Sequence, residues 1–252
     1  MDFPQLANTL YLDNAGSLPV PSPIVLNHTK DLLENIYGNT HSGSLKTSSA
    51  IQQTRTRILK HFNTDENYYT IVFTSGATAA LKLLAETYNW NSKSYYYQKE
   101  SHTSVVGISN IVSQTKNMPV EKCCFALEEE RIKDLSTKKG MVAVTAQCNF
   151  SGKRFDMGWI ANEQSKVHVL VDAASFCSTS TFDLQKYPAD FLVVSFYKMF
   201  GFPTGIGALL IKNTAADMLS KSYFGGGTVQ SIGVEPLYYS QKTRLYEKME
   251  DG

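Results

Sequence analysis

The stretch Val167-His168-Val169-Leu170-Val171-Asp172 is a short, mostly apolar run that ends in an acid, and Asp190-Phe191-Leu192-Val193-Val194 is a second such run. Continuous rather than alternating apolar runs are typical of strands that are buried on both faces of a sheet. Further strands are predicted at residues 70–73, 94–98 and 141–146, and helices at residues 22–37, about 47–62 and 79–88. Interleaved strands and helices indicate an α/β fold, with a mostly parallel central sheet flanked by helices.

The first predicted helix has both a start signal and a periodic apolar pattern. Ser22 is its expected cap and Pro23 lies in its first turn, where proline is tolerated. Apolar residues then recur at near-helical spacing at Leu26, Leu32, Leu33 and Ile36.

The composition excludes several classes of protein. Among 252 residues, 24 Lys and Arg oppose 23 Asp and Glu, for a net charge of +1. This balance argues against nucleic acid or an anionic membrane surface as the main partner, because both attract basic patches. We also expect no membrane helix, since no run approaches about 20 apolar residues. We expect no secretory signal, since Met1-Asp2-Phe3-Pro4 is not a basic region followed by an apolar core.

The four cysteines and the histidines have spacings that fit neither a zinc site nor a disulfide framework. We therefore expect no bound metal. Reduced thiols and a cytoplasmic location are the corresponding expectations.

The segment Phe73-Thr74-Ser75-Gly76-Ala77-Thr78 follows a predicted strand and opens a predicted helix. Free backbone N–H groups and the positive end of the helix dipole make such a turn suited to hold a phosphate. The turn alone is equally consistent with an ordinary capped helix.

Asp172 ends one predicted strand and Lys198 lies just beyond the end of the next. In parallel strands both side chains would emerge at the carboxyl edge of the sheet, where α/β proteins bind ligands. Separately, such residues are more often a helix cap and a solvated lysine. Together with a phosphate turn, they match the needs of a pyridine aldehyde cofactor: an amine, an acid for the ring nitrogen and an anion site.

The order of these pieces resembles the class V aminotransferase and cysteine desulfurase group of fold-type I pyridoxal 5′-phosphate (PLP) enzymes. Residues 11–16 (YLDNAG) and 37–42 (YGNTHS) resemble two further motifs of that group. Within it, the chain is similar to the molybdenum cofactor sulfurases from Leu10 to Gly252. The similarity rests on GNTHS at 38–42, FTSGATAALKL at 73–83, NFSG at 149–152 and SFYKMFG at 195–201.

The resemblance implies catalytic roles for three residues. Lys198 would form the Schiff base with PLP, and Asp172 would pair with the pyridinium nitrogen. His102 would stack on the cofactor ring, although a capping or surface histidine is the plainer interpretation of that residue.

The resemblance also implies a set of further cofactor contacts. Asn149 would approach the ring 3-oxygen, while Thr78, the backbone of Ala77 and Ser195 would hold the phosphate. Tyr197 occupies a position where bacterial desulfurases have histidine. The turn Phe224-Gly225-Gly226-Gly227-Thr228 resembles a loop that reaches the phosphate of the neighbouring subunit, which implies a homodimer in which Thr228 contacts the cofactor of the partner.

The function implied by the resemblance is transfer of sulfur from L-cysteine, with release of alanine, to the molybdenum cofactor of xanthine dehydrogenase and aldehyde oxidase. Lys198 would act as the general base, and a separate cysteine would accept the sulfur. Two alternatives remain open: another class V enzyme (a cysteine desulfurase, selenocysteine lyase or aminotransferase), or a truncated relative without catalytic activity.

One departure from the family pattern concerns the sulfur-accepting cysteine. In the family this cysteine and the arginine that binds the substrate carboxylate lie in a smaller C-terminal lobe. Cys123, Cys124, Cys148 and Cys177 do not match that cysteine. We expect residues 1–252 to form the PLP-binding large domain, with residues 1–20 as an entry segment, and to stop before both the lobe and the module that binds the molybdenum cofactor.

Overall fold

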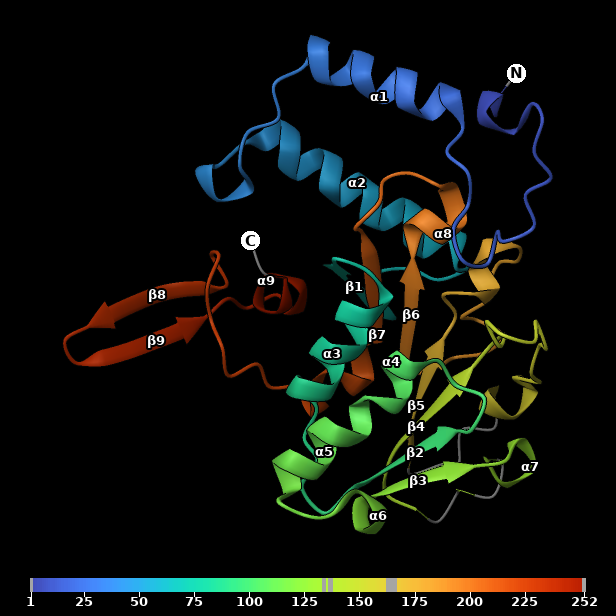
Figure 1. Cartoon of the computed structure of the whole chain (residues 1–252). Helices are drawn as coiled ribbons and strands as arrows, with labels where there is room; N and C mark the ends of the chain where they lie inside the picture. Colours follow the sequence, from blue (N-terminus) through green and yellow to red (C-terminus); the bar gives the residue numbers. More distant parts are fainter. Residues whose placement is uncertain (1, 133–134, 136–137, 162–166, 251–252) are drawn as a thin grey trace.

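The computed structural model describes residues 2–132, 135, 138–161 and 167–250. Seven strands form one sheet, with helices on both of its sides (Figure 1). Its strands, in chain order, are β1 (Tyr69–Thr74), β2 (Ser94–Gln98), β3 (Cys124–Leu127), β4 (Gly140–Thr145), β5 (Val167–Asp172), β6 (Phe191–Ser195) and β7 (Gly207–Lys212).

The spatial order of the sheet is β1-β7-β6-β5-β4-β2-β3. Neighbouring strands from β3 to β6 pair in parallel, whereas β7 is antiparallel to both β6 and β1. Strand β1 therefore runs in the same direction as β2 to β6. Six strands end at one edge of the sheet, and their following loops converge there.

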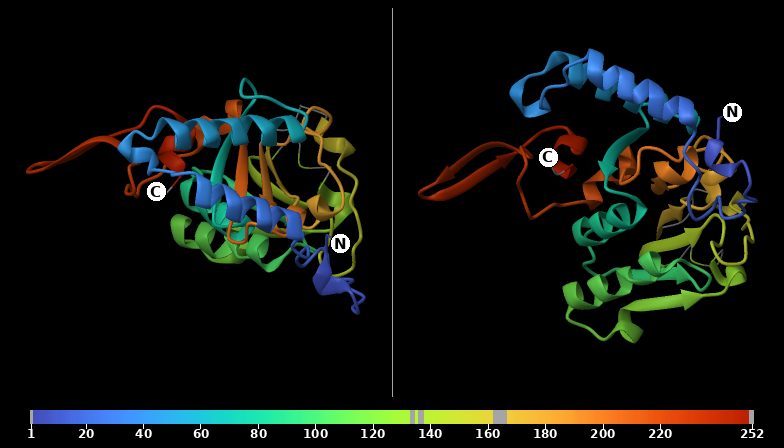
Figure 2. Two further views of the ribbon diagram at one scale, coloured as in Figure 1. Left: turned by 90° about the horizontal axis from the view of Figure 1, so that it is seen from above. Right: turned by 45° about the horizontal axis from the view of Figure 1, so that its top comes forward.

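The helices of the described residues are α1 (Ser22–Glu34), α2 (Leu45–His61), α3 (Ala77–Thr87), α4 (Thr103–Val106), α5 (Ile108–Lys116), α6 (Val120–Cys123), α7 (Glu129–Ile132), α8 (Phe196–Phe200) and α9 (Leu245–Met249). Short 3₁₀ turns are η1 (Pro4–Leu6), η2 (Thr40–Ser42), η4 (Gly158–Ala161), η5 (Phe176–Ser178) and η6 (Asn213–Met218). A separate hairpin, β8 (Val229–Val234) and β9 (Leu237–Gln241), extends away from the sheet in both views of Figure 2.

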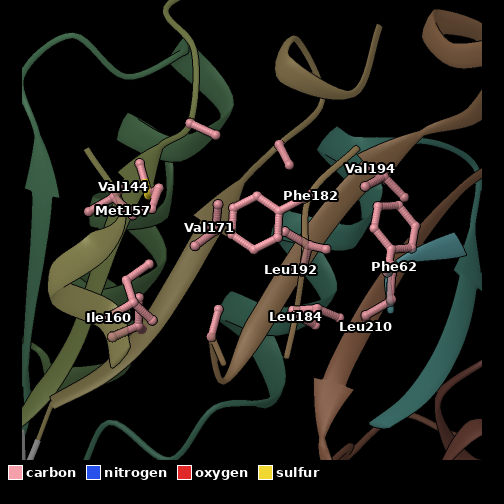
Figure 3. Close-up of a cluster of buried hydrophobic side chains, with 14 of the residues drawn as sticks. Phe62, Val144, Met157, Ile160, Val171, Phe182, Leu184, Leu192, Val194 and Leu210 are labelled. Atoms are coloured by element: carbon pink, nitrogen blue, oxygen red, sulfur yellow. The ribbon is translucent and has the colours of Figure 1, made fainter. Parts of the chain in front are cut away.

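Both faces of the sheet are covered by apolar clusters, because successive side chains of a strand point to opposite faces. In β5, Val169 and Val171 join one cluster and Leu170 joins the other. The first cluster packs against Phe62, Phe182 and other side chains that cover its face (Figure 3). Helices α3 and α5 contribute to the second cluster. Burial on two faces explains why these strands are continuous apolar runs.

The strand and helix predictions are confirmed to within one or two residues, except at the first helix. That helix ends at Glu34 and not at residue 37, because Asn35 is extended and its side-chain amide bonds to Asp31. The expectation that Ser22 is the cap is wrong: Pro21 holds the capping position and Ser22 is the first helical residue. Its apolar positions are not core either, since α1 buries none of its residues.

The sequence prediction missed β7, the hairpin β8–β9 and the short helices between β2 and β3. Strand β3 lies at the sheet edge and begins at Cys124, while Cys123 ends α6. The interpretation of Tyr95, Tyr96 and Tyr97 as sheet residues is confirmed, with Tyr95 and Tyr96 buried on opposite faces.

Two general properties of the described residues bear on function. None of their helices has the length and apolarity that crossing a membrane requires. Nor do three or more His, Cys, Asp or Glu side chains gather anywhere in the described ranges in a way that could hold a metal ion.

Edge strand β1 is held from outside the sheet by two charged side chains. Arg55, whose side chain is 6% exposed, donates to the carbonyl oxygen of Ile71 at 2.5 Å and to the carboxylate of Glu250 at 2.6 Å. The other oxygen of Glu250 accepts the backbone N–H of Phe73 at 2.7 Å. The guanidinium group also lies over the rings of Phe73 and Tyr246. Helix α9 is thereby fixed to the strand that leads into the 73–78 turn.

We expect Arg55→Ala to lower the free energy of unfolding by about 3–5 kcal/mol, because it leaves Glu250 partly buried without its charge partner. Urea denaturation followed by circular dichroism measures this change. Lys30→Ala is the control, since it removes an exposed pair with Glu34 and should cost under about 1 kcal/mol. Equal losses in the two variants would show that the Arg55–Glu250 pair does not hold β1.

Candidate functional site

A cavity of about 440 Å³ lies at the edge where the six strands end. Five segments line it: the β1–α3 turn, the loop after β2, and the residues that follow β4, β5 and β6. The lining residues are Ser75, Gly76, Ala77, Thr78, Ala79, Leu81, Lys82, His102, Ser104, Thr145, Gln147, Asn149, Asp172, Ala174, Ser175, Ser195, Tyr197 and Lys198. The structure thus brings together all of the predicted site residues except Thr228.

The turn before α3 forms one end of the cavity. Gly76 holds the capping position of α3 with φ 143°, a conformation that side chains rarely adopt, and it has no side chain with which to cap the helix. Gly207 of β7 touches this turn: a Cβ there would lie 2.7 Å from the Cα of Gly76. The N–H of Ala77, predicted to hold a phosphate, donates to Ser195 Oγ at 3.1 Å. The start of α3 presents a positive dipole end toward the cavity.

His102 both caps a helix and lines the cavity. A capping role and a position in the site are therefore compatible. Its Nδ1 accepts the N–H of Ser104 at 3.1 Å, which caps α4. The hydroxyl of Ser104 lies 2.9 Å from that of Thr78. This chain of contacts connects the first turns of α4 and α3.

Asp172 is the buried acid of the site, with 7% of its surface exposed at the end of β5. Burial raises the pKa of its carboxyl group above the usual value, because a charge is disfavoured away from water. The N–H of Ala174, at 3.0 Å from Oδ1, and the charges of His102 and Lys198 act in the opposite direction on this pKa. These groups therefore compensate the carboxylate of Asp172 only in part, and a cationic N–H group would stabilise it further.

Lys198 reaches the cavity from α8, which directly follows β6. The entry segment supports this helix from outside: the N–H of Leu18 donates to the carbonyl oxygen of Tyr197 at 3.4 Å. Gly201, which has φ 73°, ends the helix where a Cβ would lie 2.6 Å from the carbonyl oxygen of Pro19. Local packing thus sets the position from which Lys198 extends.

Gln147 and Ser175 also line the cavity, although neither is predicted from the sequence. Ser175 is buried, and its hydroxyl oxygen has no hydrogen-bond partner among the described residues. A buried polar group without a hydrogen-bond partner lowers the stability of the fold unless a ligand or a water molecule bonds to it. Its position three residues after Asp172 could have predicted this placement, because residues that follow the end of a strand lie at the same edge of the sheet.

Thr228 lies outside the lining of this cavity. It is buried in the glycine turn before β8, where its hydroxyl accepts the N–H of Gly225 at 3.0 Å. The imidazole of His41 packs against Gly227, which has φ 82°. The role of Thr228 in a partner's site stays a prediction.

The four cysteines are all buried, and none is among the described residues that line the cavity. Burial raises the pKa of the Cys177 thiol to about 12, and likewise that of Cys124, which also lies beside Cys123. Cys148 lies next to two lining residues, yet its side chain belongs to the hydrophobic cluster on one face of the sheet.

Comparison with known proteins gives consistent results. The sequence model of the family described as Aminotransferase class-V matches residues 10–251. Molybdenum cofactor sulfurase of Bos taurus is 40% identical over 278 residues, which cover 100% of this chain and 32% of that protein. The chain therefore spans about a third of the length of this curated relative.

Solved structures share the fold. The cysteine desulfurase CsdA of Escherichia coli superposes with a TM-score of 0.80 at 20% identity, over 100% of this chain and 65% of that one. A variant of C-DES with glycine covalently linked to its PLP cofactor has a TM-score of 0.76 at 18% identity, over 100% of this chain and 68% of that one.

We expect Asp172→Asn to raise the melting temperature of the ligand-free chain at pH 7 by a few degrees, since asparagine keeps the acceptor for Ala174 and carries no buried charge. Because the pKa of Asp172 is raised in the folded chain, its carboxylate form lowers the stability of the fold. This loss of stability is absent below the unfolded pKa of about 4 and grows as pH rises through the folded pKa. The difference in melting temperature should therefore shrink toward pH 4.

Asp183→Asn is the control with the opposite sign. Although burial acts against it, hydrogen bonds from Lys186, Asn63 and Gln185 hold the pKa of Asp183 below its usual value. Its carboxylate stabilises the fold above about pH 4 and loses this effect as pH falls, so this variant should melt lower at pH 7. A lower melting temperature for Asp172→Asn would contradict the conclusion that burial of the Asp172 carboxylate destabilises the fold.

Proposed function

This chain belongs to the Aminotransferase class-V family, and from that premise we propose that its cavity binds PLP. The observation that carries the proposal is the meeting of three groups at one sheet edge: the amine of Lys198, the buried carboxyl of Asp172 and the start of α3. A pyridine aldehyde with a phosphate requires these three partners. The 440 Å³ cavity is within the usual size range of small-molecule sites.

Several features of the cavity fit this cofactor. Asp172 is an acid whose pKa is raised by burial, so a ring N–H at its carboxylate would lower that pKa. Ser175 offers an unpartnered hydroxyl to a ring substituent. The glycine turn before α3 leaves backbone N–H groups near the positive dipole end, which favours a phosphate. Thr78 and Ser195 would add hydroxyl donors.

Bound PLP supplies an electron sink for bond cleavage beside a substrate amine. Asp172 would keep the ring nitrogen protonated, and His102 would cover one face of the ring. Asn149, at the exposed rim, would contact the ring oxygen, and Tyr197 would line the Lys198 side. Lys198 would hold the cofactor covalently, and its Nζ would take and return a proton at the substrate.

We further propose that the substrate is L-cysteine and that the chain acts as the PLP-binding part of a molybdenum cofactor sulfurase. The 40% identity to a curated sulfurase over the whole chain supports this choice. Such an enzyme releases alanine and passes the sulfur to the molybdenum cofactor of xanthine dehydrogenase and aldehyde oxidase. The sulfur acceptor would be a cysteine other than the four buried ones.

We propose a homodimer in the cytoplasm as the working form. Helix α1 and the hairpin β8–β9 both expose large apolar side chains, among them Leu33 at 83% and Val234 at 75%. Exposed apolar surface of this kind marks a protein contact. In the proposed dimer, the glycine turn with Thr228 would complete the cavity of the partner.

The first test is the absorbance spectrum of the chain mixed with PLP. We expect a near-visible band from the covalent link to Lys198, and no such band for Lys198→Ala. Lys186→Ala, an exposed lysine outside the cavity, should keep the band. A band of equal strength in Lys198→Ala would overturn the assignment of Lys198.

The second test adds L-cysteine to the PLP-loaded chain. Because no cysteine lines the cavity, mass spectrometry should find the four thiols unmodified. Dithiothreitol can serve as the external acceptor: the carbon–sulfur bond of cysteine breaks, and alanine and the persulfide of the added thiol form. A keto acid in place of alanine would favour an aminotransferase, and a persulfide on Cys148 would contradict the proposed acceptor.

A further inference from the structure

Arg154 lies next to the cavity wall without being part of its lining, and it touches two of the segments that build that wall. Its Nε donates to Gln147 Oε1 at 3.0 Å, and one of its terminal nitrogens donates to Thr179 Oγ1 at 3.0 Å. We propose that Arg154 is a positioning residue that sets the orientation of the Gln147 amide in the cavity. The inference rests on the proposed PLP site.

The wall after β4 places Gln147 toward the ligand. Thr145, Gln147 and Asn149 all line the cavity, whereas Ala146 and Cys148 between them are buried in the hydrophobic cluster on the other side. This alternation is that of an extended chain, in which every second side chain shares a face. Thr145 pairs in register with Asp172, so Gln147 lies two residues beyond the position that faces the buried acid.

Arg154 fixes the amide because a guanidinium group has only donors. It can bond to the amide oxygen of Gln147 and not to the amide nitrogen. The NH₂ group is consequently the part of Gln147 that remains available to the cavity. Without Arg154, the amide could rotate and present its oxygen to the same place.

The guanidinium group is itself held between two segments. Gln147 and Arg154 form an isolated antiparallel bridge, which keeps their side chains adjacent. On the other side, the guanidinium lies 5.2 Å from the ring centre of Phe176, the residue after Ser175. Arg154 therefore connects the wall that follows β4 to the segment that follows Asp172.

An oriented amide donor has a specific effect on the proposed ligand. A hydrogen bond to the anionic ring oxygen of PLP stabilises the negative charge there. This lowers the pH at which the near-visible band titrates, since the ring oxygen then attracts the proton on the linking nitrogen of Lys198 less strongly. Loss of the donor, or its reversal into an acceptor, should raise that pH.

A double-mutant cycle with Gln147→Ala and Arg154→Ala tests the proposal. The readout is the pH midpoint of the near-visible band of the PLP-loaded chain. Each single variant should raise the midpoint by about one unit, the size expected for one hydrogen bond. Arg154→Ala should add nothing in the Gln147→Ala background. A full additional shift would overturn the proposal, because Arg154 would then act on the ligand without Gln147.

Lys153→Ala is the matched control, since it removes an exposed ion pair with Glu129 from the same turn, outside the cavity lining. Its midpoint should equal that of the unchanged chain. Thermal melting distinguishes a purely structural role of Arg154 from a positioning role. A large loss of stability in Arg154→Ala together with an unchanged pH midpoint of the band would contradict the positioning role.

A cofactor-free measurement keeps this inference separate from the proposed function. In the ligand-free chain, the ¹⁵N resonances of the Gln147 side-chain amide should move toward free-amide values in Arg154→Ala and stay in place in Lys153→Ala. An unmoved resonance would overturn the positioning role. Failure of the unchanged chain to bind PLP would overturn the proposed function and leave the amide result standing.

Discussion

Burial of both faces of the sheet is the constraint on which the site depends. Residues of β4, β5 and β6 pack into apolar clusters above and below the sheet, so polar side chains can leave it only at the strand ends. Because six strands run in one direction, these ends lie along one edge. Asp172 meets Ser195 and Lys198 there for this reason, although Asp172 ends a different strand. The arrangement of the chemistry follows from strand direction.

The sole antiparallel strand of this sheet, as far as the structure describes it, adds a second condition. Strand β7 separates β6 from β1, and Gly207 at its start allows close contact with the turn before α3. On the outer side of β1, Arg55 and Glu250 occupy backbone groups that would otherwise be open to solvent or to another strand. The phosphate-binding end of the proposed site is therefore supported from both sides of β1.

The polarity of the cavity is uneven in a way that suits a ligand with separated charges. At one side, Asp172 holds a buried carboxyl whose pKa is raised. At another, the start of α3 presents a positive dipole end, with Ser195 and Thr78 beside it. The lining also includes Lys198, the unpartnered hydroxyl of Ser175 and the amide of Gln147. A flat ring that carries both a cationic nitrogen and an anionic group matches these partners.

The sequence by itself determined the α/β class, most strands, and the positions of Asp172, Lys198 and the 73–78 turn at one edge of the sheet. Those features are local, because an apolar run or a residue at a strand end is visible in adjacent letters. Only the tertiary structure decided that α1 leaves its apolar residues exposed, that Arg55 meets Glu250, and that Arg154 donates a hydrogen bond to Gln147. These outcomes depend on contacts between segments distant in sequence or on side-chain direction, which residue spacing does not encode.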